Sequence, residues 1–236
     1  MKKQKQIRVL LESGKTNIVG GLAAPVDIFL AQSDPDAADI YEWRVDCVLD
    51  DWTMDVISLL KKPIIVTVRD EKEGGKQPWM LNTRAGHYRQ YAKFATFFDI
   101  EAANVVEMSD VILSSRRRFD TGLIVSCHFL KDMPTFSAIE RGLRICQEAG
   151  GDIFKVAVNP KNYDEFIKFS GHIAKLQRRS STPIAAMCVD KFGPVSRVLS
   201  VMNRSPLVYG SMDKPVIVGQ LKVSGMPLLF KQLNAV

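Results

Sequence analysis

One lysine interrupts a run of residues that is otherwise typical of a buried strand. In the segment GDIFKVAVNP (residues 151–160), Lys155 stands between Phe154 and Val156, two residues that normally fill cores. Lysine is rarely buried, because desolvation penalises an unpaired ammonium. A buried amine that loses its proton can attack a ketone or aldehyde and form a Schiff base. The position favours this chemistry, and a structural ion pair with a glutamate is the alternative.

Other polar residues alternate with apolar ones at the ends of further strand-like runs. Because neighbouring strand residues face opposite sides, these polar side chains share the side opposite the core-forming residues. Histidine carries protons near neutral pH, and arginines bind carboxylates through paired hydrogen bonds. The pattern predicts a Schiff-base enzyme for a small carboxylated substrate, with a histidine as proton carrier. The residues in this set are Glu42, Arg44, Arg69, His128 and Lys155.

The elements that must position these residues form a regular series. Eight strands are predicted at residues 17–22, 40–45, 63–68, 97–101, 122–127, 152–157, 183–188 and 206–210. Helical patterns lie between them, including 50–62, 83–96 with Thr83 as N-cap, 135–151 and 162–179. Eight strand–helix units predict an α/β fold, a (β/α)8 TIM barrel that occupies residues 1–236 as a single domain. The first fifteen residues predict a small extra element, a hairpin at the bottom of the barrel.

Composition and motifs exclude several classes of function. The chain has no GxGxxG or GxxxxGK[ST] motif after a strand, and its Asp, His and Glu residues do not have the spacing typical of metal ligands. We therefore expect no cofactor and no metal. The net charge is +6, but the only tight basic cluster is 116–118, so we expect no nucleic acid partner. No apolar run has the length of a membrane span or a signal sequence, and the four cysteines are expected to be free thiols. These features predict a cytoplasmic protein.

Six motifs occur in the order, and near the spacing, of one known family. They are EWRVD (42–46), TVRDEKEGG (67–75), SCH (126–128), FKVA (154–157), MCVDKFGPVSR (187–197) and GQ (219–220). On these motifs the chain resembles the type I 3-dehydroquinate dehydratases, from about residue 17 to the end. The resemblance implies a (β/α)8 barrel, usually a homodimer, that dehydrates 3-dehydroquinate to 3-dehydroshikimate in the shikimate pathway of aromatic amino acid biosynthesis.

The resemblance also implies roles for individual residues. Lys155 would form the imine, His128 would be the general acid and base, and Glu73 would orient and tune His128. The substrate's hydroxyls and carboxylate would be held by Glu42, Arg44, Arg69, Arg197 and Gln220.

The sequence departs from the family's pattern at three places. Phe129 and Leu130 stand where the family has Asp-Phe after the histidine, and Val189 replaces a methionine. Val216 stands where the family has a serine, four residues before Gln220. A Schiff-base lyase or aldolase for another carboxylated ketone therefore remains an alternative. A barrel that only binds a metabolite is a third, although such a barrel needs no lysine, histidine and glutamate together.

Overall fold

Eight parallel strands form the centre of the molecule in the computed structural model, which describes residues 7, 9–11, 14–50 and 52–233. The strands are β1 (Asn17–Leu22), β2 (Ile40–Arg44), β3 (Ile64–Thr67), β4 (Phe97–Glu101), β5 (Gly122–Phe129), β6 (Ile153–Val158), β7 (Ile184–Cys188) and β8 (Leu207–Ser211). A short strand that was not predicted, β9 (Leu221–Lys222), pairs with β8. The sheet order β7-β6-β5-β4-β3-β2-β1-β8-β9 is that of a curled (β/α)8 barrel, which confirms the predicted fold.

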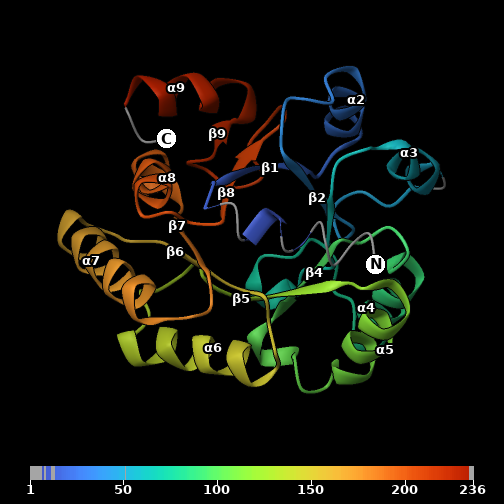
Figure 1. Ribbon diagram of the computed structural model, residues 1–236, viewed down its shortest axis with the longest axis horizontal. Coiled ribbons are helices and arrows are strands. Elements are labelled where there is room, and N and C mark those ends of the chain that lie inside the picture. The colour runs from blue at the N-terminus through green and yellow to red at the C-terminus, as the bar shows by residue number, and fades with distance from the viewer. Residues whose placement is uncertain (1–6, 8, 12–13, 51, 234–236) are drawn as a thin grey trace.

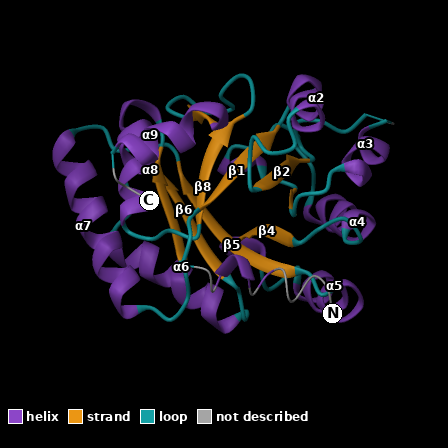
Figure 2. Ribbon diagram, turned by 45° about the horizontal axis from the view of Figure 1, so that its top comes forward, coloured by secondary structure: helices purple, strands orange, loops and turns teal. Residues whose placement is uncertain are grey.

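Helices surround the strands on the outside (Figures 1 and 2). They are α2 (Pro25–Ser33), α3 (Thr53–Leu59), α4 (Leu81–Tyr91), α5 (Ser109–Phe119), α6 (Phe136–Glu148), α7 (Tyr163–Arg179), α8 (Gly193–Met202) and α9 (Met226–Gln232). Short 3-10 turns are η1 (Glu71–Glu73), η2 (Ala102–Asn104), η3 (Asp190–Phe192) and η4 (Val223–Gly225). Thr83 is not the N-cap of α4, because the Met80 carbonyl already accepts the Arg84 N–H and the helix begins at Leu81.

Each strand separates two apolar layers, as its alternating residues predict. Trp43, Val66 and Phe154 belong to the outer layer beneath the helices. Ile65 and Ile153 belong to an inner layer that fills the lower half of the barrel. Burial of each such large side chain contributes about 1.5–3 kcal/mol. The inner face above this layer, toward the carboxyl ends of the strands, carries the polar residues.

A helical segment, rather than the predicted hairpin, lies at the N-terminal end of the barrel. Residues 7 and 9–11 are helical, and Ile7 is buried in the inner apolar layer. Leu10 and Leu11 pack against the same layer, so the spacing of three and four residues presents one apolar face to the barrel floor. The rest of the predicted element, at residues 1–6, 8 and 12–13, lies outside the described residues.

The wall between β7 and β8 is closed by side chains instead of a strand ladder. Among residues 14–50 and 52–233, no register joins these two strands. Arg197 of α8 bridges the seam, since its Nε donates to the Tyr209 carbonyl of β8 at 2.6 Å and its Nη1 to the Cys188 carbonyl of β7 at 3.2 Å. Ser196 Oγ accepts the Cys188 N–H at 2.9 Å. Within the described chain, no helix is long and apolar enough to cross a membrane.

Candidate active site

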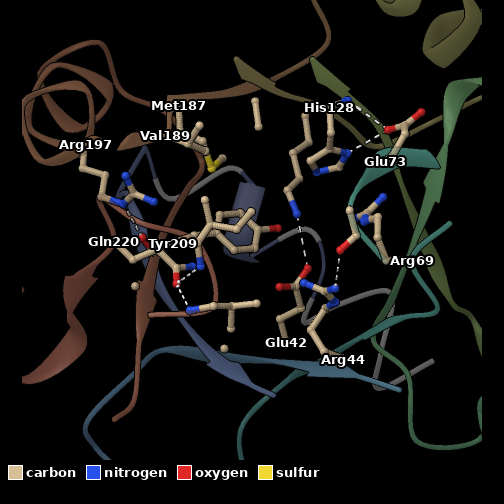
Figure 3. Close-up of a pocket in the computed structure, with 17 residues that line it drawn as sticks. Glu42, Arg44, Arg69, Glu73, His128, Met187, Val189, Arg197, Tyr209 and Gln220 are labelled. Atoms are coloured by element: carbon tan, nitrogen blue, oxygen red, sulfur yellow. Dashed lines mark hydrogen bonds and ion pairs between the residues drawn. The ribbon is translucent and has the colours of Figure 1, made fainter. Parts of the chain in front are cut away.

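All eight predicted site residues line a single pocket at the carboxyl ends of the strands (Figure 3). Glu42 and Arg44 come from β2, His128 from β5 and Lys155 from β6. The loop after β3 and the turn η1 supply Arg69 and Glu73, and α8 and the lid segment 213–220 supply Arg197 and Gln220. The pocket is also lined by Gly21, Gly74, Ala157, Met187, Val189, Tyr209, Gly210, Val216 and Ile217.

The Lys155 ammonium is buried and paired with carboxylates. Only 4% of the residue is exposed, and Nζ lies 2.8 Å from Oδ2 of Asp99 and 3.2 Å from Oε1 of Glu42. The face of the Tyr209 ring lies 4.1 Å from the same nitrogen. The charged groups in direct contact with this nitrogen are therefore carboxylates. The ion pair with a glutamate, which was the alternative to catalysis, is present between Lys155 and Glu42. Both residues also line the pocket.

Asp99 is fixed by groups on β5, on β6 and in the loop after β3. Its Oδ1 accepts hydrogen bonds from Ser126 Oγ at 2.6 Å and from Arg69 Nη2 at 2.8 Å. Burial alone would raise the pKa of Asp99, but Arg69 and Lys155 hold it well below its usual value. The carboxylate is therefore ionised and is a poor acceptor for a proton.

The two arginines that were expected to clamp a substrate carboxylate are bound to protein carboxylates. Arg69 donates to Glu101 at 2.9 Å as well as to Asp99, and it is 3% exposed. Arg44 forms a bidentate pair with Asp46 through Nε at 2.9 Å and Nη2 at 2.7 Å. A guanidinium with its planar edge occupied cannot offer the same edge to a ligand. Both arginines contribute positive charge and rigidity to the pocket wall.

His128 and Glu73 form a hydrogen-bonded pair. Oε2 of Glu73 lies 2.8 Å from Nδ1 of His128 and also accepts the His128 backbone N–H at 2.9 Å. Burial, together with the charges of Arg69 and Lys155, lowers the pKa of His128 well below its ordinary value, so the imidazole is neutral. A neutral ring that donates from Nδ1 to Glu73 leaves the lone pair of Nε2 on the cavity side (Figure 3). Burial raises the pKa of Glu73 to about 7.

Arg197 differs from the other two arginines because it has no carboxylate partner among the described residues. Its Nε and Nη1 donate to backbone carbonyls, including Gly193 at 2.8 Å and Gly219 at 3.0 Å. Its Nη2 makes no hydrogen bond to the described part of the chain. Burial lowers the pKa of Arg197 to about 10. An uncompensated cation on a pocket wall is a receptor for an anionic group.

The lid segment holds Gln220 in one orientation. Oε1 of Gln220 accepts the backbone N–H groups of Val216 at 2.8 Å and of Ile217 at 3.4 Å. Its side-chain NH₂ group is left to donate into the pocket. The carbonyl of Val218 accepts the Asp190 N–H at 2.7 Å, so the lid lies over the pocket and contacts the turn after β7.

The departures from the family's pattern have different surroundings. Val189 and Val216 line the pocket and replace a thioether and a hydroxyl by branched apolar groups. Phe129 packs into the outer apolar layer, while the backbone and ring of His128 are held by Glu73.

Sequence reasoning missed Asp99 and Tyr209. In FFDIE (97–101), Asp99 and Glu101 alternate with Phe98 and Ile100, so the same alternation that selected Lys155 could have selected them. Tyr209 gave no signal, because an aromatic residue in a strand is normally part of a core. Within the described residues, no three His, Cys, Asp or Glu side chains are grouped closely enough to hold a metal ion, and all four cysteines are free thiols.

Comparison with known proteins gives a consistent result. The family model described as type I 3-dehydroquinase matches residues 29–234. The 3-dehydroquinate dehydratase of Methanothermobacter thermautotrophicus is 30% identical over 189 residues, which cover 79% of this chain and 81% of the relative. The enzyme of the same name from Pyrococcus abyssi is 25% identical over 199 residues, covering 84% and 89%.

Solved structures show the same fold. The type I 3-dehydroquinate dehydratase from Clostridium difficile superposes with a TM-score of 0.83 at 22% identity and covers 93% of each chain. The 3-dehydroquinate dehydratase from Enterococcus faecalis gives a TM-score of 0.78 at 24% identity and covers 93% of this chain and 94% of its own. The family match spans most of the sequence and includes every strand from β2 to β8, and so this chain belongs to the type I 3-dehydroquinase family.

Proposed function

We propose that this protein is a 3-dehydroquinate dehydratase, a hydro-lyase that converts 3-dehydroquinate to 3-dehydroshikimate through a Schiff base on Lys155. One observation carries the proposal: a buried lysine nitrogen and a neutral histidine held by a glutamate face the same pocket as an arginine without a carboxylate partner. The substrate offers the complementary groups, a ketone, an acidic carbon–hydrogen bond beside it, and a carboxylate.

Substrate binding begins at Arg197. Its free Nη2 is available for the substrate carboxylate, and the amide NH₂ of Gln220 donates from the lid. Glu42, Arg44 and Arg69 face the hydroxyl-bearing part of the ring. Since Arg197 also donates to the carbonyl of Gly219, carboxylate binding and the lid share one guanidinium.

Imine formation requires that Nζ of Lys155 lose a proton before it attacks the ketone carbon. Glu42 Oε1, 3.2 Å away, is placed to accept it, whereas Asp99 is held ionised by Arg69. The nitrogen lone pair forms the new C–N bond, and Glu42 returns its proton to the ketone oxygen. This oxygen leaves as water with that proton and one from the nitrogen, and the product is an iminium ion. The iminium withdraws electrons and acidifies the adjacent carbon–hydrogen bond.

His128 then carries the proton steps. Nε2 removes the proton from the carbon beside the iminium, and the resulting imidazolium is stabilised through Nδ1 by Glu73. The same proton is given to the hydroxyl that leaves as water, which forms the carbon–carbon double bond. Hydrolysis of the iminium releases 3-dehydroshikimate and regenerates Lys155.

The test is direct. The purified chain is mixed with 3-dehydroquinate, and the absorbance of the conjugated enone is followed. Borohydride added during turnover should attach the reduced substrate to the peptide that contains residues 153–158. Absence of enone, or an adduct on another lysine, would reject the proposal, and trapping of a different carboxylated ketone with turnover would indicate another lyase.

The same proposal includes a setting for the enzyme. We infer a single barrel domain over residues 1–236, a homodimer, and action in the cytoplasm on a small carboxylated substrate, without a cofactor and without nucleic acid or membrane partners. The scattered distribution of the basic residues and the family membership support these inferences. Sedimentation velocity measures the oligomeric state.

A further inference from the structure

The nitrogen of Lys155 lies between a fixed carboxylate and an aromatic face. Oδ2 of Asp99 is 2.8 Å from Nζ, and the centre of the Tyr209 ring is 4.1 Å from it. Asp99 is completely buried and Tyr209 is 4% exposed, so both groups are largely shielded from solvent. A carboxylate and the face of an aromatic ring are both groups that stabilise a cation.

We propose that Asp99 and Tyr209 form a cation site whose catalytic purpose is to stabilise the protonated imine on Lys155, an inference that rests on the proposed function. In this view both residues act on the reacting nitrogen itself. Neither was selected from the sequence as a site residue.

The charge balance of imine formation supports this role. An ammonium and a ketone give an iminium and one water: the C–N double bond forms, the C–O bond breaks, and the oxygen leaves with two protons. The nitrogen carries one positive charge before and after the reaction. A site built for the ammonium therefore also fits the iminium, and it disfavours the neutral imine, which is the weaker electron acceptor.

The surroundings of Asp99 keep it in the ionised form that this role needs. Arg69 Nη2 and Ser126 Oγ both donate to Oδ1, which leaves Oδ2 for the lysine nitrogen. The pKa of Asp99 is held well below its usual value by Arg69 and Lys155 despite burial. Asp99 therefore pairs with the N–H of the iminium without removing its proton.

Tyr209 supplies the ring face, and its hydroxyl takes no part in the contact. The hydroxyl oxygen is buried and has no hydrogen-bond partner among the described residues. Phenylalanine would present the same ring to Nζ without burying an unpaired hydroxyl. Tyr209→Phe and Tyr209→Leu therefore form a matched pair, in which only the second variant loses the ring.

The experiment measures trapping of the iminium. Wild-type protein and the two variants are mixed with saturating 3-dehydroquinate and cyanoborohydride, which reduces iminium ions far faster than ketones. The reduced adduct is followed by intact mass, and enone formation is measured in parallel. Loss of the ring in Tyr209→Leu should slow trapping and kcat about three- to thirtyfold. Tyr209→Phe, which keeps the ring, should lose much less of both rates than Tyr209→Leu, and KM should change little in both variants.

A third variant tests the carboxylate. Asp99→Asn keeps the size of the side chain but removes its charge, and trapping should slow by at least about tenfold at unchanged KM. If Tyr209→Leu does not fold, as judged by circular dichroism, Tyr209→Met replaces it. If Tyr209→Leu is trapped as fast as the wild-type protein, and the wild-type protein turns over 3-dehydroquinate, the inference is overturned while the proposed function stands. If the wild-type chain forms neither enone nor adduct, the proposed function and this inference both fail.

Discussion

Nδ1 of His128 lies 2.8 Å from Oε2 of Glu73, and the same carboxylate oxygen accepts the backbone N–H of His128 at 2.9 Å. One oxygen thus fixes both the strand end and the ring that it carries. Such a pair selects the ring tautomer, because the nitrogen that faces a carboxylate carries the proton. The position of Glu73 on a short turn after β3 therefore determines which nitrogen of His128 faces the pocket.

The pH dependence of activity should follow the ionisation of Glu73. Its pKa is raised to about 7, chiefly by burial, and only the ionised carboxylate accepts the Nδ1 proton. We expect kcat/KM to rise with pH through about 7. Glu73→Gln should remove this rise and lower kcat by at least about tenfold. The exposed Glu71 of the same turn provides the control, since Glu71→Gln should leave the pH profile unchanged.

The raised pKa of Glu73 should also make the stability of the folded chain depend on pH. The folded-state pKa of Glu73 lies above the ordinary value of 4.5, so the folded chain binds this proton more tightly than the unfolded chain. The contribution to stability is present below the unfolded value and is lost as the pH rises through about 7. The Tm of Glu73→Gln relative to wild type should therefore increase between pH 5 and pH 8. A constant difference across this range would contradict the raised pKa.

Replacement of His128 should remove the proton steps while Lys155 remains. His128→Ala should lower kcat by about a hundredfold or more, a typical size for lost acid–base catalysis. The imine should still form, so borohydride should still trap an adduct. His172→Ala, on α7 and outside the pocket, is the matched control. Unchanged turnover in His128→Ala would require a different base.

Arg197 should affect both binding and stability. The family resemblance implied that Arg197 holds the substrate, but its guanidinium also bridges β7, β8 and the lid. Arg197→Lys keeps the charge and cannot satisfy all of these carbonyls. We expect KM to rise at least about tenfold and the free energy of unfolding to fall by about 1–3 kcal/mol, measured by urea denaturation. Arg179→Lys, on the exposed surface of α7, should change neither quantity.

Val216 tests the departure in the lid. Its backbone N–H holds Gln220, and this bond survives replacement of the side chain. The serine of the family offers a hydrogen bond to the ligand, worth about 1–3 kcal/mol when it would otherwise be unmade. Val216→Ser should raise kcat/KM for 3-dehydroquinate about ten- to hundredfold, mostly through KM. Val218→Ser in the exposed part of the lid should have no effect, and a fall in kcat/KM of a correctly folded Val216→Ser would indicate a different lid geometry or substrate.

The sequence by itself determined the barrel and the inward-facing set of polar residues. Strand alternation has a period of two, so Glu42, His128 and Lys155 were assigned to the inner face from their immediate neighbours alone. The helix stop near Gly150, which has a φ of +63°, and the cap at Asn162 are equally local features. These properties depend on a few consecutive residues and therefore appear in the sequence.

Only the tertiary structure decided which charges meet. Lys155 and Asp99 are 56 positions apart and lie on strands separated by β5, so the curl of the barrel brings them into contact. The same curl of the barrel pairs Arg69 with Asp99 and leaves Arg197 without a carboxylate partner among the described residues. The prediction of a hairpin in the first fifteen residues was wrong for a related reason. Ile7 is buried against the inner apolar layer of the barrel, and its own sequence neighbours do not indicate this contact. Contacts between distant segments arise from packing of the whole chain, which no local pattern records.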